Sequence, residues 1–269
     1  MPIKTMSWLK WVLLLIASFI LALILDTLGG LELKVGPFWL RWLLAVPVAA
    51  AMLVLYAQAV KFIEKEPAHD LPLDRLAGQT GIGLAIGVGY FVLVVGTMAA
   101  FGAYRITGTG TDWQGIIDSF LGCMFTGIGE EIAMRGVFFR WLDERLGFAP
   151  ALILSALLFG VMHIANPGAT LWSSLAIAIE AGLLLGAAYK YSGTLWLPIG
   201  IHWAWNFTQG SVFGLQVSGS DPRPSILIPS VDGPAWLTGG DFGPEASVIA
   251  VIFGALLSAW FIYRYERAH

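Results

Sequence analysis

The sequence predicts an all-α, polytopic membrane protein with about eight transmembrane helices. Of its 269 residues, 57% are hydrophobic and 12% are charged, and the mean hydropathy is +0.76. Soluble domains carry about 25% charged residues, so this composition is typical of a protein that lives in a bilayer. Apolar runs of about 20 residues, the length of a helix that crosses a bilayer, recur along the chain. The twelve Trp residues agree with this solvent, because Trp favours the lipid–water interface.

Eight segments are candidate spans. They are Trp8–Leu25, Phe38–Ile63, Thr80–Phe101, Gly115–Trp141, Pro150–Ala165, Leu171–Lys190, Leu195–Phe213 and Ala246–Tyr263. The first resembles a signal peptide, but its apolar run is long and no small-residue cleavage site follows, so we expect a retained span. Glycines in the third, "GIGLAIGVGYFVLVVG", suit close helix packing in lipid. No repeat or separate soluble domain is visible, so 1–269 is predicted to form one integral membrane domain.

The distribution of basic residues predicts the orientation, because cytoplasmic links carry an excess of Lys and Arg. With eight spans and a cytoplasmic N-terminus, ten basic residues fall inside: Lys4, Lys10, Lys61, Lys65, Arg75, Arg140, Arg145, Lys190, Arg264 and Arg267. Four fall outside: Lys34, Arg41, Arg105 and Arg223. We therefore expect both termini in the cytoplasm. The long polar loop Thr208–Glu245, with its acids Asp221, Asp232, Asp241 and Glu245, is then external. The expected location is the bacterial inner (plasma) membrane.

Charge and cysteine content exclude several classes of partner. A net charge of −3 argues against a nucleic-acid partner. The single cysteine, Cys123, cannot form an internal disulfide, and it excludes a zinc finger or a dithiol redox centre. The composition leaves the lipid bilayer as a partner.

The segment "GEEIAMR", from Gly129 to Arg135, places three charges inside an apolar helix. A charge at the centre of a membrane helix costs roughly 2.5–3.5 kcal/mol on insertion scales. Glu131 and Arg135 are four residues apart, so they share a helix face and can neutralise each other. Glu130 points about 100° away and has no local partner. An unpaired acid in lipid is either protonated or faces a wet cavity.

Two further apolar helices carry polar residues. His163 follows Phe159 by four residues in "LLFGVMHIANP", and His202 precedes Asn206 by four in "LPIGIHWAWNF". Helix rise allows both histidines to lie at the depth of Glu130, so one watered cavity would satisfy all of them. A carboxylate and a histidine can deprotonate a water and protonate a leaving amine. A second histidine and an asparagine amide can stabilise an oxyanion.

Each feature also has a structural interpretation. A Glu–Arg pair at helical spacing can be an interhelical staple, a buried His is often a packing residue, and an Asn in a membrane helix often bonds a neighbouring helix. The conjunction of these groups on three helices favours a functional site. No Gly-x-Ser-x-Gly signature is present, so the set suggests amide hydrolysis by an activated water without a covalent intermediate.

The three motifs in this order, "EEIAMR", "FGVMH" and "HWAWN", resemble the CPBP family of CAAX proteases and bacteriocin-processing or immunity-related membrane proteins, also called the Abi family. The resemblance implies an intramembrane, glutamate-dependent endopeptidase whose four-helix catalytic core is 115–213. It implies that Glu130 and His163 activate the water and that His202 and Asn206 form the oxyanion site. Glu131, Arg135 and Phe159 would then support them. The implied substrate is a membrane-associated peptide or protein, with lipidated substrates included, and the implied chemistry needs no cofactor.

Three alternatives stay open. Glu130, His163 and His202 are the ligand types of a hydrolytic zinc site, although no His-Glu-x-x-His pair is present. Such a metal-dependent membrane peptidase would lose activity to a chelator and regain it with zinc. A non-catalytic immunity or peptide-binding protein would not need acid, base and oxyanion donors together. A transporter with Glu130 as a proton relay is disfavoured by the lack of an inverted repeat.

Overall fold

The computed structural model describes residues 12, 16, 20 and 37–268. The expected first span, Trp8–Leu25, lies outside the described residues apart from three positions. The other seven expected spans are helical. The first three helical rods are α2 (Phe38–Glu64), α3 (Leu76–Ala100) and a continuous rod of α4 (Trp113–Glu131), the π-helical segment Ile132–Phe139 and α5 (Arg140–Leu146). The protein is an all-α polytopic membrane protein, as the sequence predicts.

The second half of the chain supplies the remaining rods. They are α6 (Phe148–Met162) with the turn His163–Ala165, α7 (Leu171–Ile177) with the π-helical segment Ala178–Leu183 and α8 (Leu184–Ser192), α9 (Trp196–Phe207) with the π-helical segment Thr208–Val212, and α11 (Val248–Ala268). The short helix α10 (Ala235–Thr238) precedes α11. Among the described residues, five rods are long and apolar enough to cross a membrane: Phe38–Glu64, Leu73–Ala100, Phe148–Ala165, Leu171–Ser192 and Val248–Ala268. The rods that begin with α4 and α9 are not among these five.

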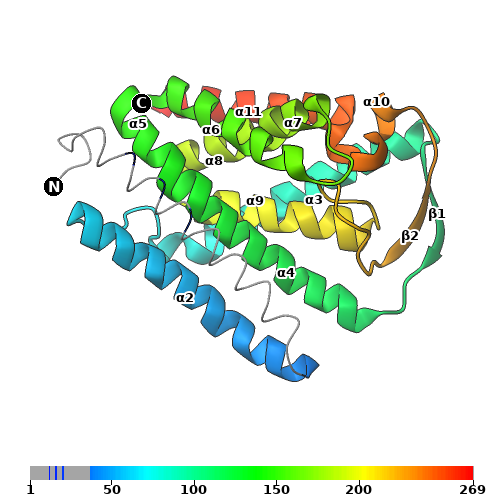
Figure 1. Ribbon diagram of the computed structural model, residues 1–269, viewed down its shortest axis with the longest axis horizontal. Helices are drawn as coiled ribbons and strands as arrows, with labels where there is room; N and C mark the ends of the chain where they lie inside the picture. Colours follow the sequence, from blue (N-terminus) through cyan, green and yellow to red (C-terminus); the bar gives the residue numbers. More distant parts are fainter. Residues whose placement is uncertain (1–11, 13–15, 17–19, 21–36, 269) are drawn as a thin grey trace.

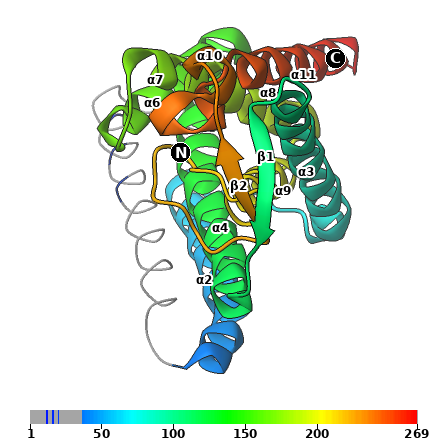
Figure 2. The same ribbon diagram turned by 90° about the vertical axis from the view of Figure 1, so that its right-hand side faces the viewer.

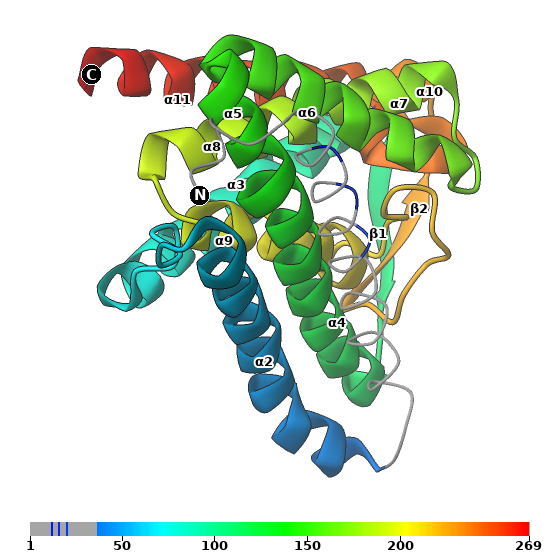
Figure 3. The same ribbon diagram turned by 60° about the vertical axis from the view of Figure 1, so that its left-hand side comes forward.

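Helix α9 lies in the middle of the bundle (Figures 1 and 3), where it packs against α3, α4 and α8. It is buried from Trp196 to Ile201 and again around Asn206. Helix α3 packs against it at very short range, because both helices have a glycine at the crossing. A Cβ added to Gly83 would lie 2.4 Å from the Leu197 carbonyl oxygen and 2.9 Å from the Cα of Gly200. Small residues at such a crossing let two membrane helices approach closely.

Local sequence explains where several helices begin and end. The side chain of Asp112 accepts a hydrogen bond from the amide of Gly115 at the start of α4. Thr170 and Ser173 form a reciprocal capping box at the start of α7. Gly193 takes φ +67° directly after α8, a backbone conformation that glycine adopts without a steric penalty.

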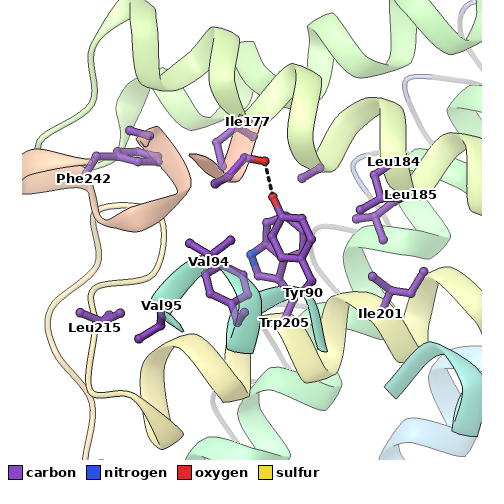
Figure 4. Packing of buried hydrophobic residues seen from close by; sticks show 14 of the residues in the cluster. Tyr90, Val94, Val95, Ile177, Leu184, Leu185, Ile201, Trp205, Leu215 and Phe242 are labelled. Atoms are coloured by element: carbon purple, nitrogen blue, oxygen red, sulfur yellow. Dashed lines mark hydrogen bonds between the residues drawn. The ribbon is translucent and has the colours of Figure 1, made fainter. Parts of the chain in front are cut away.

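The core has two apolar clusters. One lies between α2, α4 and α5, and it includes Tyr56, Phe125 and Trp141. The other lies between α3, α9 and the rods of α7 and α11. In this second cluster the ring of Tyr90 stacks on Trp205 with ring centroids 4.3 Å apart, and its hydroxyl donates to the carbonyl of Ala250 at 2.6 Å (Figure 4). Tyr90 therefore joins α3 to both α9 and α11.

A two-stranded antiparallel sheet, which the sequence analysis did not expect, lies outside the helical rods. In it β1 (Tyr104–Thr109) pairs with β2 (Leu227–Val231), which lies within the long polar loop Thr208–Glu245. The sheet lies at one end of the bundle (Figure 2). The Thr107 hydroxyl donates a hydrogen bond to the carbonyl of Ile228, 121 residues further along the chain, so no local sequence pattern predicts the pairing.

Tyr104 fastens this sheet to the bundle. Its hydroxyl donates to the carbonyl of Phe213, just after α9, at 2.9 Å. Burial raises the pKa of the Tyr104 phenol to about 12. The phenol is therefore a hydrogen-bond donor across the physiological pH range, and the sheet stays tied to the end of α9.

Candidate active site

The expected Glu131–Arg135 pair is present and is fully enclosed. The Nη1 atom of Arg135 lies 2.8 Å from Oε1 of Glu131, and the two residues are 1% and 0% exposed. The other guanidinium nitrogen, Nη2, donates to the carbonyls of Ala181 and Gly182 at 3.3 and 3.2 Å. Arg135 therefore links the rod of α4 to the rod of α7 and α8.

Two π-helical segments make this linkage possible. Arg135 lies in Ile132–Phe139, and its carbonyl acceptors lie in or beside Ala178–Leu183. A π-helix widens the helical turn and occurs frequently at functional sites. The same segment also exposes the carbonyl of Gly136, which accepts from Tyr56 Oη at 3.0 Å and from Arg140 Nε at 2.8 Å. The sequence carries no simple signal for these wide turns, and the sequence interpretation missed them.

His202 lies between the two adjacent glutamates. Its Nδ1 is 2.9 Å from Oε1 of Glu131, and its Nε2 is 3.9 Å from Oε2 of Glu130. Oε1 of Glu131 is thus shared by Arg135 and His202, whereas the Glu130 carboxylate has no contact of hydrogen-bond length among those to the described residues. The Glu130 side chain is 23% exposed and that of Glu131 is 0% exposed. The two acids therefore differ: Glu131 is held by Arg135 and His202, whereas Glu130 faces His202 only at 3.9 Å.

His163 lies at the end of α6, where the helix tightens into the turn His163–Ala165. Its Nδ1 is 2.7 Å from the carbonyl oxygen of Phe159. A carbonyl only accepts, so Nδ1 carries the proton and Nε2 is left with its lone pair. This is the tautomer in which a histidine can act as a base through Nε2.

The ring of Phe159 connects the three motifs. It is 2% exposed, and its centroid lies 4.8 Å from the His163 ring and 6.2 Å from the His202 ring. The guanidinium carbon of Arg135 lies 4.8 Å from the same centroid. Phe159 therefore orients both histidines and covers the Glu131–Arg135 pair with an apolar face.

Asn206 is buried on α9, one helical turn after His202. The structure thus joins Glu130, Glu131 and Arg135 to one another through His202 and Glu131, and the ring of Phe159 lies beside Arg135 and both histidines. Asn206 follows His202 by one turn of the same helix.

Three buried acids were missed by the sequence interpretation: Asp70, which accepts hydrogen bonds from the hydroxyls of Tyr56 and Tyr189, and the acids Glu180 and Glu245. Glu180 is 0% exposed in the rod of α7 and α8, and its Oε2 lies 2.9 Å from Tyr90 Oη. A lone acid in "LAIAIEAG" is a signal that could have been found, because a charge in an apolar span is rare. Glu245 was expected in a solvated external loop, but it is 2% exposed. It lies among polar loop residues, so nothing in its sequence neighbourhood marks it as buried.

Metal binding can be assessed from the arrangement of donors. Within residues 37–268 and the three described positions before them, no group of three or more His, Cys, Asp or Glu side chains is placed to hold a metal ion. Glu130, His163 and His202, the ligands of the zinc alternative, do not form such a group. That the reaction needs no metal stays a prediction, and a chelation experiment tests it.

The fold and the site define a polytopic membrane protein with a buried glutamate, histidine and arginine centre. Residues 111–208 match the model of the family described as type II CAAX prenyl endopeptidase Rce1-like. The matched segment contains all seven residues of the candidate site. This segment is therefore similar to the CAAX proteases (CPBP family), which are endopeptidases. No curated protein matches the chain.

Proposed function

We propose that the chain is an intramembrane endopeptidase that hydrolyses a peptide bond of a membrane-associated peptide or protein, with a water activated by Glu130 and His163. The observation that carries the proposal is the division of the two acids. Glu131 is occupied by Arg135 and His202, and Glu130 beside it is partly exposed. A partly exposed carboxylate without a hydrogen bond to the described residues is suited to accept a proton from water, and we infer that the Nε2 atom of His163 assists it.

The reaction follows from these groups. The activated water oxygen attacks the carbonyl carbon of the scissile bond, and its proton passes to Glu130 or to Nε2 of His163. The oxyanion of the tetrahedral intermediate accepts hydrogen bonds from the Asn206 amide and from His202. When the C–N bond breaks, the stored proton passes to the leaving amine. A carboxylic acid and an amine are released, and the base regains its initial state.

The position of His202 sets a condition on its role. Its Nδ1–H faces Glu131, so a hydrogen bond to an oxyanion requires a second proton on Nε2. The carboxylates of Glu130 and Glu131 lie on either side of the ring and stabilise that imidazolium. In this proposal His202 acts as a charged donor and His163 as a neutral base, so the two histidines have different tasks.

The substrate class follows from the family. CAAX proteases act on membrane-associated, prenylated peptides, and the site of this chain lies in helices of a membrane protein. We therefore propose that the substrate reaches the site from the bilayer, with prenylated peptides as the first candidates. The proposed location is the bacterial inner membrane.

The decisive experiment compares Glu130→Gln with Glu131→Gln. Glu130→Gln preserves size but removes the base, so we expect a folded protein whose peptidase activity is lower by at least ~10²-fold. Glu131→Gln breaks a buried pair, so we expect a lower melting temperature together with lost activity. Both variants are purified in detergent and assayed with fluorogenic membrane peptides, one farnesylated and one unmodified. Cleavage by Glu130→Gln at the wild-type rate would show that the mechanism is wrong.

A further inference from the structure

Glu245 is a buried acid that the mechanism above does not use. It lies in the turn Pro244–Ala246, directly before α11, and is 2% exposed. Its carboxylate accepts hydrogen bonds from Nε1 of Trp205 at 3.0 Å, from Oγ of Ser218 at 3.1 Å and from the amide of Ser218. No Lys or Arg in the described part of the chain forms an ion pair with it. A buried carboxylate held by neutral donors is costly, and its retention calls for a specific use.

The hydrogen bond from Trp205 connects Glu245 to α9. Trp205 lies directly before Asn206 and three residues after His202. Its ring stacks on Tyr90, and its Nε1–H is directed to Glu245. The side chain is therefore fixed at both its face and its edge, so this turn of α9 cannot rotate without breaking the contact with Glu245.

The hydrogen bonds from Ser218 connect Glu245 to the turn at His163. The carbonyl of Ser218 accepts from Nδ2 of Asn166 at 2.9 Å. The backbone N–H of Asn166 in turn donates to the carbonyl of His163 at 3.1 Å. Ser218 adopts φ +49°, a left-handed conformation that is rare for a residue with a side chain. The hydrogen bonds from the backbone N–H and the hydroxyl of Ser218 to the Glu245 carboxylate hold that conformation in place.

We propose that Glu245 is a positioning residue of the peptidase site: its carboxylate ties the turn after α6 to α9, and so sets His163 against His202 and Asn206. His163 is the residue directly after α6, where a helix frays most easily, and the loop anchored by Glu245 covers the turn that follows it. Catalytic geometry tolerates little displacement, since a shift of about 1 Å can cost about 10²-fold in rate. This inference rests on the proposed function.

The test is a double-mutant cycle in the full-length protein. Glu245→Gln presents an amide N–H₂ to groups that are themselves donors, and Asn166→Ala cuts the link from Ser218 to the turn. If Glu245 acts through Asn166, each single variant lowers kcat by roughly 10-fold to 10²-fold with little change in KM. The double variant is then no slower than the slower single variant, because the two changes break one chain of contacts. The proposal is overturned if the kcat losses of the two single variants multiply in the double variant. It is also overturned if Glu245→Gln has the wild-type kcat per folded molecule.

The matched control is Asp143→Asn. Asp143 is a partly buried acid with a close partner, Nζ of Lys190 at 2.5 Å, and it lies on α5, at the end of the bundle opposite the β1–β2 sheet (Figure 1). It should keep the wild-type kcat, whatever it does to the melting temperature.

Amide hydrogen exchange provides a readout that does not depend on cleavage. The amides of Asn166 and Ala169 close the turn after α6. In Glu245→Gln they should exchange faster than in the wild type, and in Asp143→Asn they should not. If the wild type cleaves no peptide, the proposed function fails. The exchange measurement still tests whether Glu245 holds the turn after α6. Equal exchange in Glu245→Gln and the wild type would show that Glu245 does not hold the turn.

Discussion

At the scale of single residues, one carboxylate oxygen organises the site. Oε1 of Glu131 accepts hydrogen bonds from both Arg135 and His202, so the expected Glu131–Arg135 pair is part of a contact among three residues. The spacing of the residues predicted the Glu131–Arg135 half of it, because residues four apart meet on a helix face. The His202 half joins two helices whose packing no spacing rule describes. The sequence interpretation therefore placed His202 in one cavity with Glu130 and His163, but it did not predict the contact of His202 with Glu131.

Arg135→Ala should destabilise the protein by about 3–5 kcal/mol, because Glu131 would become a buried charge with its main partner removed. Arg135→Lys should recover only part of this loss. The guanidinium uses Nη1 for Glu131 and Nη2 for two carbonyls, and a single ammonium cannot reproduce that fork. Thermal melting in detergent measures both variants. Arg105→Ala, at an exposed position of β1, is the control and should melt with the wild type. Wild-type melting of Arg135→Ala would mean that the pair is not structural.

At the scale of elements, the periodicity of apolar residues was sufficient to locate the helices but not their irregularities. The expected spans from Phe38 onwards all coincide with helical rods, because length and hydropathy follow directly from the bilayer thickness. The three π-helical segments and the β1–β2 pair were not expected. Both depend on contacts between distant segments, such as Arg135 with Gly182 and Thr107 with Ile228. Such contacts leave no trace in a local window of sequence.

The crossing of α3 and α9 gives a prediction with an internal control. Gly83→Ala introduces a Cβ 2.4 Å from a backbone oxygen of α9, so the helices must separate and the melting temperature should fall. Gly89→Ala, on the same helix, meets nothing within 4 Å. It should leave stability unchanged or raise it by up to ~1 kcal/mol, since alanine favours the helix over glycine. If both variants melt together, the close crossing does not contribute to stability.

At the scale of the whole molecule, the described basic residues separate by end. The end of the bundle that holds α5 and the C-terminus also holds the end of α2 and the start of α3 (Figure 1). At this end lie eight basic residues: Lys61, Lys65, Arg75, Arg140, Arg145, Lys190, Arg264 and Arg267. At the other end lie Arg41, Arg105 and Arg223. The basic links that the sequence analysis assigned to the cytoplasm therefore lie together at one end of the bundle. This agrees with the predicted orientation, which stays a prediction.

A reporter fused to the C-terminus tests this orientation directly. If the basic end faces the cytoplasm, a fused cytoplasmic reporter is active and a reporter that works only outside the cell is silent. A second fusion within the loop 220–225, at the opposite end, should give the reverse pattern. An externally active C-terminal fusion would contradict the orientation.

Chelation tests whether the water is activated by side chains alone. With Glu130 and His163 as the base, incubation with a strong chelator followed by dialysis should leave the rate of peptide cleavage unchanged. A loss of activity that zinc restores would support the metal-dependent alternative instead. The control is Glu130→Gln under the same treatment, which should stay inactive with or without zinc.

The position of Glu245 and β2 late in the chain has a consequence for biosynthesis. A ribosome makes the residues of all three motifs, from Glu130 to Asn206, before it makes Leu227–Val231 and Glu245. Until those last segments emerge, β1 has no partner and neither Trp205 nor Ser218 has its acceptor. A nascent chain that already contains every residue of the three motifs therefore still lacks the contacts that hold Trp205 and Ser218, so the candidate site completes its folding only after the last loop has been made.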